Sequence, residues 1–257
     1  MGRIVVAGSF DDLRSGHVRM LEEAAKLGDV EVLLDTDELI AAQGLPPLKY
    51  PFEERRYLLE AVRYIWTVVP AGPQKLGTPG GEKRDDQAGP PPVLPNGRIY
   101  SEESLRTIPS PAPLSVDTAP GRKRVIVTGC FDWFHSGHVR FFEEASAYGD
   151  LYVGVGSDAN VRALKGEGHP LFPQNERAYM VQAVRHVRRA FISSGSGWLD
   201  AEPEIAIIRP DAYVVNEDGD RPEKRDFCRN AGIEYVVLAR VPKPGLPRRE
   251  STRLRGF

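Results

Sequence analysis

The sequence predicts an α/β protein built on a doubly wound parallel sheet, present as two tandem copies of which the first is truncated and degenerate. Three observations predict this fold. Short β-branched strands run into glycine turns, other apolar runs are typical of strands buried on both faces, and an internal repeat contains both features. The 257 residues suffice for one large domain or two small ones.

Each copy is expected to contain the same series of elements. A β-branched strand comes first, then a glycine turn, and then a helix that we expect to end at Gly28 in one copy and at Gly149 in the other. An apolar second strand comes next, and this order implies a parallel sheet with right-handed crossovers. The paired strands are residues 4–6 and 125–127, then 30–34 and 151–155.

The internal repeat relates the start of the chain to its second half. Residues 8–19 align with residues 129–140 at a constant offset, since 129 minus 8 and 140 minus 19 both give 121. These are therefore two copies of one α/β unit. Further matches are residues 22–24 with 143–145, 28–29 with 149–150 and, after a slip of one residue, 54–57 with 176–179.

The two copies diverge in their later residues. The first runs into a stretch rich in Pro, Gly and charge, which is typical of a linker, with one short element expected at residues 99–108. The second continues through apolar runs at 205–208, 211–215 and 233–238, which complete a sheet of about five strands. We therefore predict a degenerate half-domain at 1–70, a linker at 71–121 and a complete domain at 122–257.

Composition excludes several classes of protein. The net charge is near −2, which does not indicate a surface that coats nucleic acid. No apolar run approaches the roughly 18 residues of a membrane span, and no signal-peptide pattern precedes the first strand, so we expect a cytoplasmic protein. With only Cys130 and Cys228, neither a disulfide framework nor a zinc site is predicted.

The most informative motif comes after the strand at 125–127 and reads Gly-Cys-Phe-Asp-Trp-Phe-His-Ser-Gly-His. A glycine turn lets the backbone approach a phosphate, and the helix after it offers unpaired N–H groups. His135 and His138 can then donate to the oxygens of an α-phosphate, where charge builds during nucleotidyl transfer. The turn residues expected to contact the nucleotide are Gly129, Cys130, Phe131 and Asp132.

These residues also have plainer structural interpretations. His135 can be a surface residue and His138 a helix cap, although this is disfavoured when the H-x-G-H comes after G-x-F-D at the end of a strand. A small apolar residue in a tight turn explains Cys130 better than a thiol nucleophile does.

Cationic and hydroxyl side chains further along the chain predict more phosphate contacts. Lys165 lies in a glycine-flanked stretch and is expected to be a mobile clamp on phosphate, the alternative being a solvated loop lysine. Arg177 opens a helix after Pro173. A second anion site, or else a capping box or basic tail, is predicted from Arg248, Arg249, Ser251 and Thr252.

Together these residues resemble the cytidylyltransferase family, which includes glycerol-3-phosphate, phosphocholine and phosphoethanolamine cytidylyltransferases and the nucleotidyltransferase domain of the heptose-phosphate pathway enzyme. The resemblance covers nearly all of residues 124–257 and includes Trp198 and residues 224–227. It implies a Rossmann-like nucleotidyltransferase fold. It also implies that His135, His138 and Lys165 stabilise the reacting α-phosphate. The other phosphates are then held by Arg177, Ser251 and Thr252.

The sequence departs from the family pattern in two places. The family's arginine usually stands five residues before the Ser-Thr pair, where this chain has Leu246, and we expect Arg240, Arg248 or Arg249 to replace it. Relatives commonly have Gly-Asp-Asp at the strand end where the base or metal is bound. The corresponding nucleotide-binding candidates here are Asn216, Glu217 and Asp218.

The resemblance further implies a reaction. CTP is the expected nucleotide, with ATP as the alternative because archaeal FAD synthases carry similar motifs, and the acceptor is a phosphomonoester of an alcohol or a sugar. The acceptor phosphate attacks in line without a dedicated general base, and pyrophosphate leaves with Mg²⁺. Trp198 is a candidate for acceptor binding, and no protein ligand of the metal is assigned. A non-catalytic nucleotide sensor on the same fold is the competing hypothesis.

The first copy lacks the equivalent residues. Arg14 replaces the first histidine and Gln43 stands where the lysine should be, so this copy is predicted to be catalytically inactive. Its layout resembles phosphoethanolamine cytidylyltransferase, which implies an internal pseudo-dimer with residues 1–70 as the partner, further homodimerisation being left open. Alternatively, Arg14 and His17 bind a regulatory nucleotide.

Overall fold

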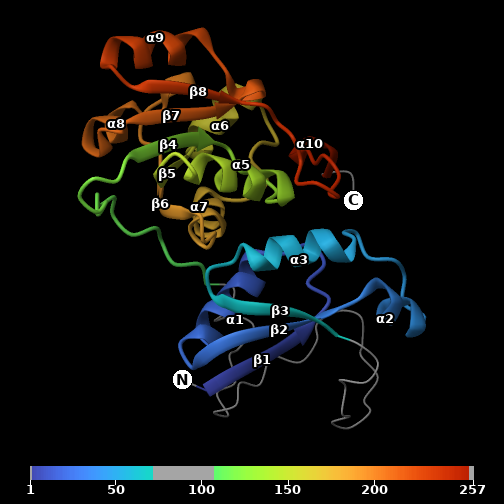
Figure 1. The fold of residues 1–257 in the computed structure, drawn as a ribbon. Coiled ribbons are helices and arrows are strands. Elements are labelled where there is room, and N and C mark those ends of the chain that lie inside the picture. Colours follow the sequence, from blue (N-terminus) through green and yellow to red (C-terminus); the bar gives the residue numbers. More distant parts are fainter. Residues whose placement is uncertain (1, 72–106, 255–257) are drawn as a thin grey trace. The chain divides into compact units, whose positions relative to one another are not determined.

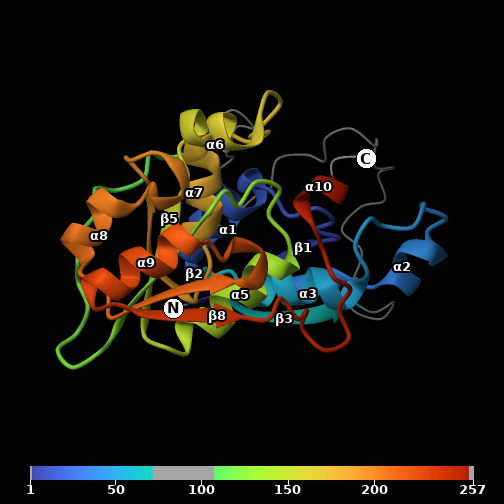
Figure 2. The same cartoon turned by 90° about the horizontal axis from the view of Figure 1, so that it is seen from above.

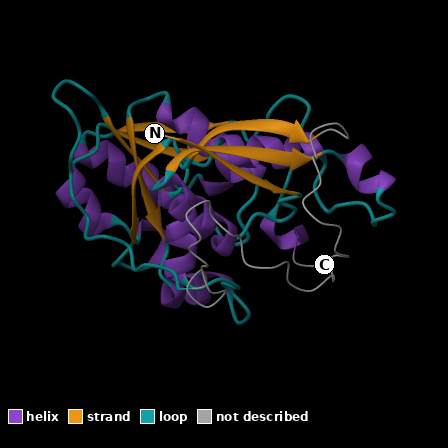
Figure 3. Ribbon diagram, turned by 90° about the horizontal axis from the view of Figure 1, so that it is seen from below, coloured by secondary structure: helices purple, strands orange, loops and turns teal. Residues whose placement is uncertain are grey.

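The computed structural model describes residues 2–71 and 107–254, and the chain divides into two compact units, Met1–Ile108 and Pro109–Phe257. Each unit contains a parallel sheet with helices packed beside it (Figure 1 and Figure 3), which confirms the predicted α/β fold class. Within the described ranges, no helix has both the length and the apolar character needed to cross a bilayer. The element predicted at residues 99–108 lies outside the described residues, apart from its last two.

The sheet of unit 2 has the strand order β6-β5-β4-β7-β8, and all its strand pairs are parallel. The chain winds outward from β4 to one edge, then returns to β7 and winds to the other. This reversal places a topological switch point between β4 and β7, where ligands bind at the carboxyl ends of strands. The strands are β4 (Arg124–Gly129), β5 (Asp150–Val155), β6 (Val187–Ile192), β7 (Ala212–Asn216) and β8 (Glu234–Leu238).

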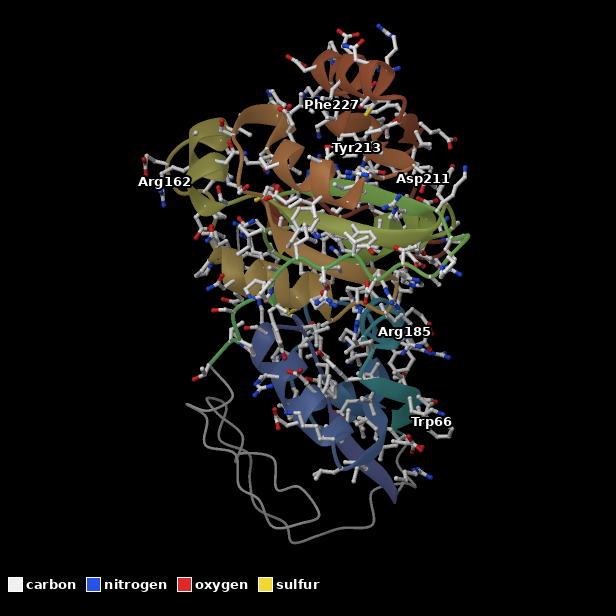
Figure 4. The ribbon with its side chains drawn as sticks, turned by 90° about the vertical axis from the view of Figure 1, so that its left-hand side faces the viewer. Trp66, Arg162, Arg185, Asp211, Tyr213 and Phe227 are labelled. Atoms are coloured by element: carbon white, nitrogen blue, oxygen red, sulfur yellow. The ribbon has the colours of Figure 1, made fainter. Side chains whose placement is uncertain are left out.

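Helices cover both faces of this sheet (Figure 1 and Figure 2), as a doubly wound fold requires. On the face of α8 and α9, a core joins Ile126 and Tyr152 of the sheet to Ile205, Ile208 and Cys228, and Figure 4 shows Tyr213 and Phe227 in this region. The helices are α5 (Ser136–Ser146), α6 (Asp158–Lys165), α7 (Gln174–Gln182), α8 (Glu202–Ile208), α9 (Pro222–Ala231) and α10 (Ser251–Leu254), with 3₁₀ turns η1 (Gly197–Leu199) and η2 (Glu217–Gly219).

One predicted strand of unit 2 was wrong. Residues 205–208 belong to α8, in which Ile205 and Ile208 are buried while Ile207 is 58% exposed, and this is helical periodicity. The missing strand is β6, whose two central arginines conceal its apolar pattern. Because β6 is an edge strand, charged residues are tolerated there.

The last part of the predicted linker packs onto unit 2. Leu114 lies against the core under α8 and α9, and the Thr118 hydroxyl is 2.8 Å from the Tyr152 hydroxyl. Arg188 of β6 donates to both the side chain and the backbone carbonyl of Asp117. Although its composition is typical of a linker, the segment near residues 114–118 is therefore part of the domain.

Unit 1 reproduces the first three strands of unit 2, in the order β1-β2-β3. Val5 on β1 is 48% exposed, whereas its repeat partner Ile126 is fully buried, because residues 2–71 contain no counterpart of α8 or α9. Trp66 on β3 is also exposed (Figure 4). The elements are β1 (Gly2–Gly8), α1 (Ser15–Ala25), β2 (Gly28–Asp35), α2 (Asp37–Ala42), α3 (Phe52–Glu60) and β3 (Ile65–Ala71), the last not predicted from sequence.

The glycines expected to end the first helix of each copy have another role. The helices end at Ala25 and Ser146, and Gly28 and Gly149 stand where the next strand starts. A Cβ at either position would overlap the backbone of the neighbouring strand. The glycines therefore permit the close approach of two parallel strands.

Candidate active site

A cavity of about 410 Å³ opens in unit 2 at the carboxyl ends of β4 and β7, at the topological switch point. It brings together most of the residues predicted from sequence, and Arg177, Glu217, Arg248 and Arg249 do not line it. The side chain of Thr252 is not among those described. The predicted residues at the cavity are Gly129, Cys130, Phe131, Asp132, His135, His138, Lys165, Trp198, Asn216, Asp218, Arg240 and Ser251.

The turn after β4 is shaped by its own side chains. Phe131 adopts a left-handed φ of 53°, and a Cβ on Gly129 would lie 2.8 Å from its ring, so position 129 requires glycine. The Asp132 carboxylate accepts hydrogen bonds from the backbone N–H groups of Leu171 and Phe172 at 3.0 and 3.1 Å. Asp132 therefore fixes the loop before α7 against the turn, and this differs from the nucleotide contact predicted for it.

Ser251 connects the C-terminal segment to the same turn. Its hydroxyl donates to the backbone carbonyl of Asp132 at 2.6 Å, and α10 begins at this residue, as the sequence predicted. The bond places the N-terminal end of α10 against the cavity.

His135 is held in one orientation and one tautomer. Its Nδ1 accepts the backbone N–H of Gly137 at 3.1 Å, so the ring proton lies on Nε2. A Cβ at position 137 would lie 2.9 Å from the His135 ring, which explains the glycine of the H-x-G-H. The Nε2–H is buried, and no described residue is bonded to it. A buried donor in a cavity wall implies a ligand that accepts from it.

His138 completes a pair of stacked imidazoles. Its ring centroid lies 3.9 Å from that of His135, at an interplanar angle of 21°, and Phe131 packs edge-on against it. The Nδ1 atom of His138 is also buried without a hydrogen-bond partner among the described residues. Two uncompensated ring nitrogens thus lie at the N-terminal end of α5, where a helix favours anions.

Burial keeps both imidazoles neutral. It lowers the pKa of His135 to about 3, aided by the charges of Arg240 and Arg249. It also lowers the pKa of His138 well below the usual range, with further contributions from His135, Arg240 and Lys165. In the free protein near neutral pH, each ring therefore offers one N–H donor, and an approaching anion raises both pKa values.

This arrangement predicts a loss of stability in acid. The unfolded state binds protons at His135 below pH 6.5 and the folded state only near pH 3, so the stabilisation is present above 6.5 and falls as the pH drops. For His135 alone, we expect about 2 kcal/mol to be lost between pH 7.5 and 5. Urea unfolding of the chain and of His135→Gln at pH 7.5 and 5.0 measures this. An equal acid-induced loss in both proteins would contradict it.

Lys165 is the last residue of α6, and not a loop residue as predicted. The helix ends at Gly166, whose positive φ of 84° favours glycine. The lysine is exposed and lines the cavity. A cation on a long flexible stem at this point can reach a phosphate inside.

Arg240 is the arginine that the geometry favours in place of the family's missing one. Its guanidinium lines the cavity, 2.6 Å from Asp218 and 3.1 Å from the carbonyl of Arg249. It also lines a smaller adjoining hollow together with Arg248 and Arg249. Arginine side chains therefore line both the cavity and the hollow beside it.

Arg177 has a structural role, which corrects the prediction that it binds phosphate. The side chain is 1% exposed, and its guanidinium donates to the carbonyls of Phe172, Cys130 and Gly156 and to the Asp158 carboxylate. These bonds join the turn after β4, the end of β5 and the start of α6. No donor remains directed into the cavity.

The first copy supports this assignment. Arg55, the repeat partner of Arg177, is fully buried and donates to the carbonyls of Tyr50, Ser9 and Asp35 and to the Asp37 carboxylate. The same bonds therefore persist in the copy predicted to be inactive. Such a residue serves the architecture of the turn and not the chemistry.

In unit 1 the position of the first histidine is occupied by an ion pair. Arg14 lies 2.6 Å from Asp12, and Lys49 lies 3.2 Å from the same carboxylate. His17 accepts the backbone N–H of Arg14 through Nδ1 at 3.1 Å. The inactivity of this copy and its role as an internal partner remain predictions.

The cavity also contains polar residues to which the sequence assigned no role. They come from β4, α6, the loop between α6 and α7, the segment after β6 and the start of α9, so the fold alone brings them together. What these residues share is a position at the carboxyl edge of the sheet, where ligands bind. This position could have identified them from the sequence only if β6 had been predicted. These residues are Thr128, Asn160, His169, Asp200, Arg221 and Lys224.

No dedicated metal cage is formed by the described side chains. Within residues 2–71 and 107–254, no group of three or more His, Cys, Asp and Glu side chains is arranged to hold a metal ion. The Asp132 carboxylate is used by backbone N–H groups, and Asp218 is paired with Arg240.

Comparison with known proteins gives consistent matches. Residues 126–238 match the family described as cytidylyltransferase-like. The Bifunctional protein HldE of Geobacter metallireducens is 46% identical over 119 residues, which are 46% of this chain and 21% of that protein. HldE of Wolinella succinogenes is 37% identical over 125 residues, 47% of this chain and 24% of the relative.

Among solved structures, a similar chain is the lipopolysaccharide core biosynthesis protein from Thermoplasma volcanium. It is 26% identical, has a TM-score of 0.40, and the match covers 46% of this chain and 98% of that one. By contrast, the match with the two curated relatives spans only about a fifth to a quarter of their length.

Proposed function

Because residues 126–238 form a cytidylyltransferase-like domain, we propose that this protein is a nucleotidyltransferase that moves CMP from CTP to a phosphorylated small-molecule acceptor and releases pyrophosphate. The observation that carries the proposal is the stacked pair of His135 and His138. Both have buried, uncompensated ring nitrogens at the N-terminal end of α5, in a cavity at the topological switch point. Such a site fits the α-phosphate of a nucleotide.

The proposed mechanism relies on positioning and charge stabilisation. The substrate is the magnesium complex of the nucleotide, whose α-phosphate accepts from Nε2 of His135 and from the His138 ring. Lys165 and Arg240, which both line the cavity, neutralise the phosphate chain. The acceptor phosphate is already an oxyanion near neutral pH, and it attacks in line without a general base. Donors fixed before the reaction stabilise the charge that develops at the α-phosphate.

ATP is the second candidate nucleotide. We consider it because of the side chain at position 216, which is an asparagine. This residue ends β7 at the cavity, where the family commonly has glycine. A carboxamide both donates and accepts, so it can pair with the ring edge of cytosine or of adenine. The triphosphate contacts are the same for both nucleotides.

Thermal unfolding of the full chain with Mg²⁺ and either CTP or ATP tests the choice. A ligand at about 100 times its Kd is expected to add roughly 2.7 kcal/mol to the stability. A shift with CTP alone supports cytidylyl transfer, and a shift with ATP alone corrects the nucleotide. No shift with either would refute nucleotide binding, and binding without pyrophosphate release for any phosphomonoester would favour a sensor.

A further inference from the structure

The turn after β1 in unit 1 has the same backbone framework as the turn after β4 in unit 2. The Asp11 carboxylate accepts from the backbone N–H groups of Lys49 and Tyr50 at 2.7 and 2.9 Å. Asp132 of unit 2 binds the loop before α7 in the same way. Both turns also contain left-handed residues at the same two positions of the repeat. The two turns therefore share a backbone conformation and differ in their side chains.

Three side chains of the turn in unit 1 are charged where those of unit 2 are not. In unit 2 these positions hold two aromatic rings and an aliphatic side chain, all without charge near neutral pH. In unit 1 they hold two cations and one carboxylate, so the charges occur as a set. The charged residues are Asp12, Arg14 and Lys49, and their repeat partners are Trp133, His135 and Leu171.

The three charges meet at one oxygen atom. Oδ2 of Asp12 lies 2.6 Å from the guanidinium of Arg14 and 3.2 Å from Nζ of Lys49. Only 14% to 26% of each side chain is exposed, so water screens these ion pairs less than it screens pairs on the open surface. The other oxygen, Oδ1, is buried and accepts no hydrogen bond from any described residue. The carboxylate is therefore held by two cations through one of its two oxygens.

An arginine and a lysine that converge on one oxygen form a typical arrangement for binding phosphate. The carboxylate of Asp12 supplies the negative charge and the acceptor atom that a phosphate oxygen would supply. It is attached to the chain only two residues before Arg14, so its effective concentration at the cations is on the order of millimolar or higher. A free anion must displace this carboxylate before it can bind the two cations.

We infer that Asp12 is a built-in anion that closes a cationic phosphate site in unit 1. Its carboxylate takes the place of a phosphate oxygen on Arg14 and Lys49, so the wild-type unit binds no free phosphate there. Loss of the carboxylate opens the site to a phosphate-bearing anion. This differs from a regulatory nucleotide bound by Arg14 and His17, for which the wild-type site must be open. The inference concerns unit 1 alone and does not rest on the proposed function.

Calorimetric titration of the full chain with inorganic pyrophosphate tests the inference. Asp12→Asn keeps the size of the side chain and removes its charge, and asparagine tolerates the left-handed φ of 55° at this position. This variant should bind one more pyrophosphate per chain than the wild type does, with an affinity for that site at least roughly tenfold higher. Any pyrophosphate bound by unit 2 contributes equally to both proteins, so the comparison holds whether or not unit 2 binds nucleotide.

A double variant assigns the additional site to the turn of unit 1. When Arg14→Gln is combined with Asp12→Asn, one of the two cations is lost, and the additional pyrophosphate site should disappear. Glu60→Gln is the matched control, because Glu60 is a carboxylate of the same unit that pairs with Arg56 on the surface. It should bind as many pyrophosphate ions per chain as the wild type.

Two results would overturn the inference. If Asp12→Asn is folded and binds no additional pyrophosphate, the carboxylate closes no site and the three charges only hold the turn together. If Arg14→Gln alone loses a site that the wild type has, the site is already open. Asp12→Gly is the second variant should Asp12→Asn fail to fold, because glycine also suits the positive φ, and it should gain the same site.

Discussion

Replacement of His138 by alanine is expected to lower turnover by roughly 10²- to 10³-fold, the usual effect of removing one preorganised donor from a developing negative charge. The reason is the geometry of the stacked rings. His138 packs against His135 at 3.9 Å and keeps an uncompensated nitrogen in the cavity. Pyrophosphate release at saturating nucleotide and acceptor measures the loss in kcat. Nucleotide affinity should change much less, because several other groups hold the triphosphate.

The chain contains its own control for this experiment. His17 is the repeat partner of His138, lies in the first turn of α1 and packs edge-on against Phe10, as His138 does against Phe131. His17→Ala should leave turnover unchanged, because Arg14 takes the place of the first histidine in that copy. The mechanism is wrong if His138→Ala keeps full activity. A loss in His17→Ala would instead assign a function to unit 1.

Replacement of Arg177 by methionine is expected to cost about 3–5 kcal/mol of stability, as for other buried charges whose removal leaves their partners unpaired. The substitution leaves the carbonyls of Cys130 and Gly156 and the carboxylate of Asp158 without their donor. Urea unfolding followed by tryptophan fluorescence measures this. In a Trp66→Phe background, the signal comes from Trp133 and Trp198 of unit 2 alone.

Arg55→Met in unit 1 is the paired experiment for the structural role. It removes the same set of bonds from a copy without the first histidine, so Trp66 fluorescence should report a comparable loss. A stable Arg177→Met that fails to bind nucleotide would return Arg177 to the phosphate site, against the geometry.

Much of the fold could be predicted because its signals are local. The glycine turns, the β-branched runs and the repeat each lie within a few consecutive residues. The prediction failed at two places. Arg188 and Arg189 break the apolar pattern of the edge strand β6, so that strand was missed. The isoleucines of α8 form a short apolar run, so that helix was taken for a strand. Without β6, nothing in the predicted order of strands brought the segment containing Asp200 to the cavity.

The candidate site divides in the same way. His135, His138 and Lys165 were predicted because their motifs are contiguous, and the structure places all three at one cavity. Lys224 and Asp200 are 24 residues apart in sequence, and only the wound sheet brings them to one cavity. Arg177 shows a different limit. An arginine is a suitable residue type for binding phosphate. Whether its guanidinium is instead taken up by backbone carbonyls, as here, depends on tertiary structure and cannot be seen in the sequence.

The turn that follows the first strand of each copy contains residues other than glycine with positive φ values. Phe131 and Trp133 adopt positive φ values of 53° and 50°, and their partners Phe10 and Asp12 adopt 48° and 55°. Such conformations cost about 1–3 kcal/mol each and are commonly read as a mark of catalysis. Here the same distortion occurs in a copy that has an arginine in place of the first histidine. In this protein, a left-handed residue in the turn is thus evidence of shared ancestry between the copies, and an active site must be recognised from its side chains.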